Sequence, residues 1–192
     1  MNKNKAKYLI YLFILLGCIV LLPPRNSQAA MIALSDEALT ARAQTIIIGT
    51  VQSTNSYWNE DRTAIMTDIA VKIDESLKGM EAGTIITIQV QGGIVDDIAM
   101  RVSDTPVFEE GEEVLLFLNE KDGTPGIQRL AARAQGKYSI QINQATQKKE
   151  AISESGVRVN AAGTVYTDQG ASVQLDEFIT KIKAIIVQQQ NE

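Results

Sequence analysis

The chain has 192 residues, no histidine, one cysteine and a formal net charge of −5 at pH 7. Because the cysteine lies in an N-terminal segment that we expect to be removed, the rest of the chain lacks the residues for Ser-His-Asp or Cys-His catalysis, for imidazole or thiolate zinc sites and for haem ligation. That segment holds four of the 18 basic residues and none of the 23 acidic ones. The mature charge of 14 − 23 = −9 therefore argues against nucleic acid or an anionic membrane as a partner.

The first 29 residues are predicted to be a Sec-type signal peptide. Three lysines precede an apolar run at residues 8–22, and small residues follow at 27–30. We expect cleavage after Ala29 or Ala30, and an exported protein that is periplasmic, extracellular or at the cell surface. The apolar run is shorter than the roughly 20 residues that span a bilayer. Two alternatives would place the protein at a membrane: an uncleaved signal, or lipidation of Cys18 in a lipobox-like sequence.

Residues 30–192 are predicted to form a single globular domain. About 160 residues are enough to bury roughly 68–70% of the unfolded surface. No cysteine follows the signal peptide, so no disulfide supports the domain even in an oxidising compartment. Its stability therefore has to come from an apolar core.

The domain is predicted to begin with a short helix and a buried strand. Ser35 suits the N-cap position of the helix, which we expect to end near Ala43. The β-branched, apolar run at residues 45–52 indicates a strand buried on both faces, with Gly49 marking a bulge or a close backbone approach. Residues 55–62 are predicted to be a polar loop.

The middle of the chain contains the strongest strand patterns. Alternation over residues 65–74 predicts a long strand with one buried face, and residues 84–91 supply the next strand. A glycine pair then begins a long loop, expected over residues 92–110. Residues 113–119 predict a central strand, and residues 121–126 a turn.

Two shorter strands and a second helix complete the predicted elements. The strands are expected at residues 127–132 and 137–142, followed by a polar loop or weak hairpin over residues 143–170 that includes residues 157–159. An amphipathic C-terminal helix is expected over about 174–187, packed on the core. Its apolar stripe consists of Leu175, Phe178, Ile179, Ile182, Ile185 and Ile186.

Six strands without crossover helices, flanked by a helix near each end, predict a mainly β fold. The pattern favours a small OB-like β-barrel over about residues 45–142, of the type that binds oligonucleotides or oligosaccharides. Such a barrel protects its strand edges by near-closure and leaves its loops free for a ligand.

Four short motifs carry a family resemblance: AQTIIIGTV at 43–51, IDESLKG at 73–79, GEEVLLFL at 111–118 and QGKY at 135–138. They resemble a family of uncharacterised exported bacterial proteins. The order of elements also resembles the netrin-like module of tissue inhibitors of metalloproteinases, a five-stranded barrel with a helix near each end. Those inhibitors chelate zinc through a disulfide-bonded N-terminal cysteine. Because no cysteine follows the signal peptide here, the resemblance implies the fold and not that inhibitory mechanism.

The candidate ligand-binding residues lie in the two predicted loops. Tyr57 and Trp58 form an aromatic pair in a polar stretch, and exposed aromatic side chains anchor sugars and protein partners. The alternative for Trp58 is that it folds back over one end of the barrel. The long loop adds Gly92, Gly93 and Pro106 to the candidate face.

Carboxylates are the main remaining candidates for catalysis. Acidic residues flank Gly111 on both sides, at 109–110 and 112–113. Neighbouring residues in a turn seldom place two carboxyl groups roughly 5–9.5 Å apart, as glycoside hydrolysis requires. The sequence therefore favours a non-enzymatic binding module for an exported protein or a cell-envelope polymer, without cofactor or metal. A carboxylate-dependent hydrolase and a purely structural envelope protein are the alternatives.

Overall fold

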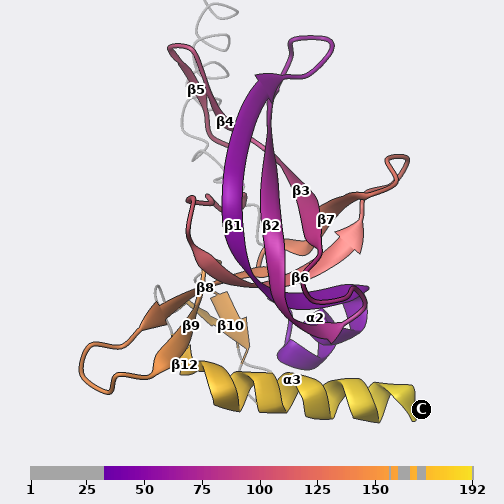
Figure 1. The fold of residues 1–192 in the computed structure, drawn as a ribbon, viewed down its shortest axis with the longest axis vertical. Helices are drawn as coiled ribbons and strands as arrows, with labels where there is room; N and C mark the ends of the chain where they lie inside the picture. Colours follow the sequence, from indigo (N-terminus) through magenta and orange to yellow (C-terminus); the bar gives the residue numbers. More distant parts are fainter. Residues whose placement is uncertain (1–32, 156, 160–164, 168–171, 192) are drawn as a thin grey trace, which may run out of the picture. The chain divides into compact units, whose positions relative to one another are not determined.

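The computed structural model describes residues 33–155, 157–159, 165–167 and 172–191 (Figure 1). The predicted signal peptide, its cleavage site and Cys18 lie outside these residues. The described part is mainly β, with a short helix near its beginning and a longer helix at its C-terminal end, as predicted. Neither helix in the described ranges has the length and apolar character needed to cross a lipid bilayer.

The short helix α2 (Asp36–Arg42) begins and ends where the sequence predicts. The Ser35 hydroxyl accepts a hydrogen bond from the Ala38 N–H at 3.2 Å, which satisfies one of the free amides of the first turn. At the other end, the Lys78 ammonium donates to the carbonyls of Thr40 at 3.1 Å and Ala43 at 2.7 Å. A lysine from a neighbouring strand thus caps the free carbonyls of the last turn.

Five strands pair in a ring. β1 (Thr45–Trp58), β2 (Ile65–Lys78) and β3 (Ile85–Gln91) are consecutive antiparallel neighbours. β3 pairs in parallel with β7 (Ile127–Ala134), which is antiparallel to β6 (Glu113–Glu120). β6 returns to β1 through six antiparallel residue pairs, which closes the ring. We call these five strands the ring.

The sheet continues beyond the ring on one side. β6 also pairs with β8 (Lys137–Ile142), β8 with β9 (Lys149–Ser153), and β9 with β12 (Ser172–Gln174). β10 (Val157–Val159) and β11 (Val165–Thr167) form a separate hairpin.

The sequence prediction of a polar loop or weak hairpin over residues 143–170 missed β9. This strand has the mostly polar sequence KEAIS, and Ala151 is its one fully buried apolar residue. An alanine and a serine facing the protein interior give too weak an alternation to stand out in the sequence. The hairpin of β10 and β11 agrees with the weak hairpin that was expected around residues 157–159.

β1 and β6 are buried on both faces because they lie between two apolar clusters. Ile46 and Leu115 point toward the helices, whereas their neighbours Ile47 and Leu116 point into the ring. This arrangement confirms that residues 45–52 form a strand buried on both faces. Gly49 is required there, because a Cβ at this position would lie 2.5 Å from the Lys72 carbonyl oxygen.

The C-terminal helix α3 (Leu175–Gln190) packs on the outer cluster, as its apolar stripe predicts. Leu175, Phe178, Ile182 and Ile185 are buried. The Phe178 ring lies 5.0 Å from the Tyr138 ring, a contact between α3 and β8. In Figure 1 the helix lies beside β9 and β12, the strands that continue the sheet beyond the ring.

Two predicted loops are partly strand. β1 continues through the predicted loop at 55–62 and pairs with β2 up to Trp58, so the turn begins only at Asn59. The loop predicted over residues 92–110 opens with a hairpin of β4 (Gly93–Val95) and β5 (Ile98–Met100). Both predictions failed because pairing with a partner strand, rather than the polarity of the segment, decides its conformation.

Substituting Phe178 with alanine should lower the free energy of unfolding by about 3–5 kcal/mol, because the ring is buried against Tyr138. Val187, on the same helix, is 58% exposed, and Val187→Ala is the control with little expected loss. Urea titration followed by circular dichroism measures both. Equal stabilities for the two variants would show that α3 does not belong to the core.

Candidate functional site

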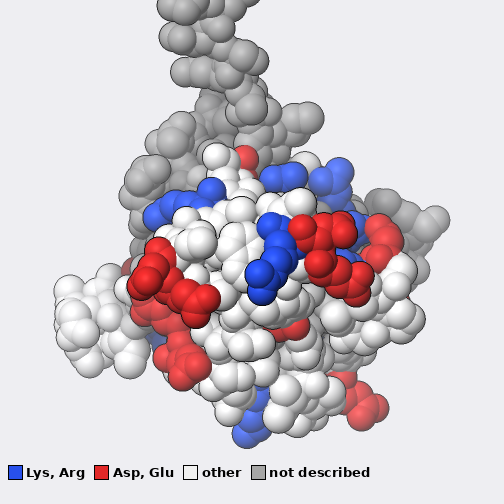
Figure 2. All heavy atoms as spheres, turned by 90° about the horizontal axis from the view of Figure 1, so that it is seen from above, with Lys and Arg blue, Asp and Glu red and all other residues white. Residues whose placement is uncertain are grey.

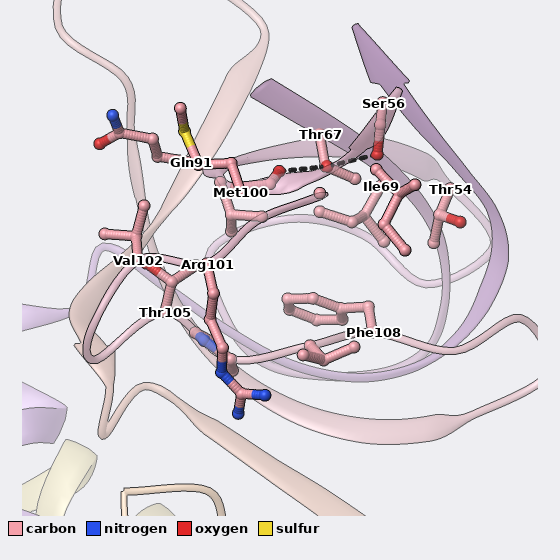
Figure 3. A pocket seen from close by; sticks show the side chains of 16 residues that line it. Thr54, Ser56, Thr67, Ile69, Gln91, Met100, Arg101, Val102, Thr105 and Phe108 are labelled. Carbon is pink, nitrogen blue, oxygen red and sulfur yellow. Dashed lines mark hydrogen bonds between the residues drawn. The ribbon is translucent and has the colours of Figure 1, made fainter. Parts of the chain in front are cut away.

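A pocket of about 430 Å³ opens beside the β4–β5 hairpin (Figure 3). Its walls come from β1, β2, β3, the hairpin and the segment after it, residues 101–108. The hairpin packs across the outer ends of β1 and β2. Small-molecule and side-chain binding sites in proteins have volumes of roughly 300–1,000 Å³, so this pocket is large enough to hold a ligand.

The base of the pocket is continuous with the core inside the ring. Ile69 and Phe108 both belong to the cluster inside the ring and also line the pocket. Val90 and Pro106 add further apolar surface. Because Ile69 is fully buried and Phe108 only 8% exposed, the packed core supports the pocket and gives it a preformed apolar base.

Two hydroxyl groups form the polar side of the pocket. The oxygens of Ser56 and Thr67 lie 2.7 Å apart, and the Thr67 hydroxyl donates to the Gly92 carbonyl at 2.6 Å. Thr67 has only one hydroxyl hydrogen, so Ser56 must be the donor between the two. The Ser56 oxygen thereby retains acceptor capacity at the pocket wall.

Gly93 allows the hairpin to approach these hydroxyls. A Cβ on Gly93 would lie 2.4 Å from the oxygens of both Ser56 and Thr67, and its φ of +136° is unfavourable for other residues. The glycine is therefore needed both for its backbone conformation and for the close approach of β4 to β1 and β2.

Arg101 is the sole charged residue among those that line the pocket. Its side chain is exposed, and the described part of the protein offers it no hydrogen bond or ion pair. In Figure 3 the guanidinium lies on one side of the Phe108 ring, and Ser56 and Thr67 lie on the other. The pocket thus presents a cation and an acceptor oxygen on either side of an apolar base.

A buried lysine behind the pocket holds one of its walls. Lys137 is 1% exposed, and its ammonium donates to the Val107 carbonyl at 2.6 Å and to Glu112 Oε1 at 2.7 Å. The same ammonium lies 3.5 Å from Glu154 Oε1 and 4.7 Å from the centre of the Phe108 ring. A buried ammonium requires such partners, so these contacts attach the segment with Val107 and Phe108 to β8.

Ser139 completes the lysine cluster. Its oxygen lies 2.5 Å from Glu112 Oε1 and 2.6 Å from Glu154 Oε1. We call Lys137, Ser139, Glu112 and Glu154 the lysine cluster. None of these four residues lines the pocket, and their polar groups bind one another, so the cluster supports the pocket from behind.

The acidic residues around Gly111 differ in where their carboxylates point. Glu113 pairs with Lys149 at the surface, at 2.7 Å. Glu112 differs, because its carboxylate turns inward to the lysine cluster. Within the described ranges, no group of three or more acidic, histidine or cysteine side chains is placed to hold a metal ion.

The structure brings three of the five predicted site residues together. Gly92, Gly93 and Pro106 line the pocket, whereas Tyr57 and Trp58 do not. Tyr57 and Trp58 are neighbours in β1 and point to opposite faces, so they do not form one aromatic surface.

Tyr57 belongs to a polar network on the face of the sheet away from the pocket. Its hydroxyl donates to Asp68 Oδ2 at 3.1 Å and accepts from Gln89 Nε2 at 2.7 Å. Gln89 in turn accepts from the Lys121 ammonium. Burial raises the pKa of the Tyr57 phenol, and the hydrogen bond to Asp68 raises it further.

Sequence reasoning missed Arg101, Phe108 and Lys137. Phe108 and its neighbour Val107 are an apolar pair in a polar stretch, which is a signal for a contact with the core. Lys137 and Ser139 share one face of a strand, but their acidic partners are distant in the sequence. Glu112 lies 25 positions from Lys137, and Glu154 lies 15 positions from Ser139. Nothing in the local pattern points to those partners.

No protein-family model matches the chain, and no curated protein sequence matches it. The resemblances found in the short motifs therefore stay predictions. The functional assignment depends on the pocket and on the residues that form it.

Replacing Lys137 with methionine should lower the free energy of unfolding by about 3–5 kcal/mol, because Glu112 and Glu154 would lose the cation that lies between them. Lys149→Met removes an exposed ion pair to Glu113 and should cost only about 0–1 kcal/mol. Thermal or urea unfolding compares the two. Losses of similar size would contradict a special role for the buried ammonium.

Gly93→Ala should destabilise the protein by about 1–3 kcal/mol, because the added methyl group meets Ser56 and Thr67. Gly123 has a positive φ of +72° but open space around its Cβ, so Gly123→Ala reports the backbone cost alone. Urea unfolding of both variants measures how much more Gly93→Ala costs, from the clash together with its less favourable φ of +136°. The steric account fails if Gly123→Ala costs as much as Gly93→Ala.

Proposed function

We propose that the protein is an exported, non-enzymatic binding module and that the pocket beside the β4–β5 hairpin is its ligand site. The observation that carries this proposal is the composition of the pocket. An apolar base, an acceptor oxygen on Ser56 and the side chain of Arg101 line one preformed space. A few polar groups around an apolar cavity are typical of a site that orients a ligand.

The finer fold that we propose is an OB-like barrel similar to the netrin-like module. Pairing of the five strands in the order β1-β2-β3-β7-β6, with a return to β1, supports it. The helices α2 and α3, one before and one after the ring, add to the likeness. Proteins with small barrels of this kind bind their ligands through the loops around the strands, which fits the position of the pocket.

The partner that we propose is an exported protein or a cell-envelope polymer. The signal-like N-terminal sequence and the mature charge of 14 − 23 = −9 support this choice over nucleic acid. On the face seen in Figure 2, positive side chains stand among negative ones and do not form a continuous basic surface.

Exposed apolar side chains around the pocket favour a partner that is larger than the pocket itself. Ile94 and Val107 line the pocket and are 68% and 61% exposed. Ile98, across the hairpin from Val95, is 53% exposed. Apolar side chains gathered at the mouth of a pocket are a common feature of interaction sites, and they support this choice of partner. We call Ile94, Ile98 and Val107 the rim.

A carboxylate-dependent hydrolase has less support. The Glu112 carboxylate binds Lys137 and Ser139 and does not line the pocket. General acid or base catalysis requires a carboxyl group within hydrogen-bonding reach of a bound substrate. No carboxylate lines the pocket within the described part of the chain.

The rim provides the test of a binding function. The purified protein, immobilised, is used to capture ligands from an envelope extract, and the affinity for each retained ligand is measured. Ile94→Asp and Val107→Asp should weaken binding by about 2 kcal/mol or more, roughly thirtyfold, because a charge replaces an apolar contact at the interface.

Ile85→Asp and Val187→Asp are matched controls, because these side chains are 63% and 58% exposed and do not line the pocket. Their affinities should equal that of the unchanged protein. A ligand whose affinity is the same for the rim variants and the controls does not use this site. If every retained ligand behaves in that way, the proposed function is wrong.

A further inference from the structure

We infer that the pocket takes the C-terminal residue of a polypeptide, with an apolar side chain on the base and the terminal carboxylate on Arg101. This inference rests on the proposed function, because it names the chemistry of the ligand for the same pocket. It follows from three groups that the pocket presents together: a free guanidinium, an apolar base and a hydroxyl acceptor.

The guanidinium of Arg101 selects the charge of the ligand. It is exposed and has no partner within the described part of the protein, so its donors are free to bind an anion in a bidentate manner. A single cation matches a single carboxylate. A polyanion such as a phosphate is less well matched, because the mature chain carries a net charge of 14 − 23 = −9.

The apolar base selects the side chain. Val90 and Phe108, with the fully buried Ile69 behind them, provide an apolar surface that a branched aliphatic or aromatic side chain covers well. A pocket of about 430 Å³ has room for one such side chain and the adjoining backbone. Burial of that side chain supplies the apolar part of the binding free energy.

The Ser56 hydroxyl favours a peptide over a simple fatty acid. Its hydrogen is used toward Thr67, so its oxygen can only accept another hydrogen bond. A peptide offers a backbone N–H for this acceptor, whereas a fatty acid has no donor once it is ionised. The exposed rim points the same way, because a longer chain leaving the pocket would cover Ile94 and Val107.

Three probes test the assignment with the purified protein: acetyl-Ala-Ala-Leu with a free carboxylate, the same peptide with a C-terminal amide, and octanoate. Binding is followed by amide chemical shifts in NMR titrations. The free acid should saturate the pocket and shift the Ser56, Thr67 and Gly93 amides. The amide should bind at least about tenfold more weakly, because it lacks the charge-assisted bond to Arg101.

Variants assign the contacts. Arg101→Gln should weaken the free acid by at least about tenfold and leave the amide peptide nearly unchanged, because only the acid uses the guanidinium. Arg129→Gln is the matched control, since Arg129 is also exposed and binds Asp122 away from the pocket. Ser56→Ala should weaken the peptide acid and leave octanoate unaffected. Circular dichroism confirms that each variant is folded.

Three outcomes would overturn the inference: no binding of the free acid, equal binding of acid and amide, or octanoate binding as tightly as the peptide. An Arg101→Gln variant that binds the free acid as tightly as the unchanged protein would overturn it as well. A failure of all three probes, combined with rim-dependent capture in the extract experiment, would reject the C-terminal ligand and leave the binding function standing. Failure of both experiments would reject both.

Discussion

The position of the pocket depends on one buried positive charge. Lys137 loses its water shell on folding, and the desolvated ammonium is stable only with hydrogen-bond acceptors and negative charge around it. It obtains these from Glu112 and Glu154 and from the Val107 carbonyl. Because one of these acceptors is a backbone atom, compensating the charge also sets the path of the segment that forms a pocket wall.

The ring supplies the other constraint on the site. Side chains of successive residues in β1 and β6 alternate between the cluster under the helices and the cluster inside the ring. Ile69 and Phe108 belong to the inner cluster and also form the base of the pocket. The binding surface is therefore an extension of the packed interior, and substitutions that loosen the interior would change the shape of the site.

Local patterns predicted the elements whose burial is regular. The stripe of α3, the N-cap at Ser35 and the alternation in β2 each follow from the sequence, because neighbouring residues carry the signal. β9 and the continuation of β1 to Trp58 do not, since pairing with distant strands decides them. Gly92, Gly93 and Pro106 follow from their position in the predicted long loop, whereas the lysine cluster depends on contacts between residues 15 to 27 positions apart.

The parallel contact between β3 and β7 has a consequence for how the protein opens. Only two residue pairs, Thr87 with Ile127 and Ile88 with Gln128, join these strands, whereas six pairs join β1 to β6. The contact also spans 40 positions in sequence, so its loop-closure entropy is large relative to the few hydrogen bonds it gains. Partial unfolding should therefore begin at the contact between β3 and β7. Amide hydrogen exchange in β7 should then be faster than in β1. The pocket walls from β1 and β2 lie away from this contact, whereas the wall from β3, which carries Val90 and Gln91, belongs to a strand that takes part in it. Opening at the β3–β7 contact should therefore loosen the β3 wall of the pocket before the other two.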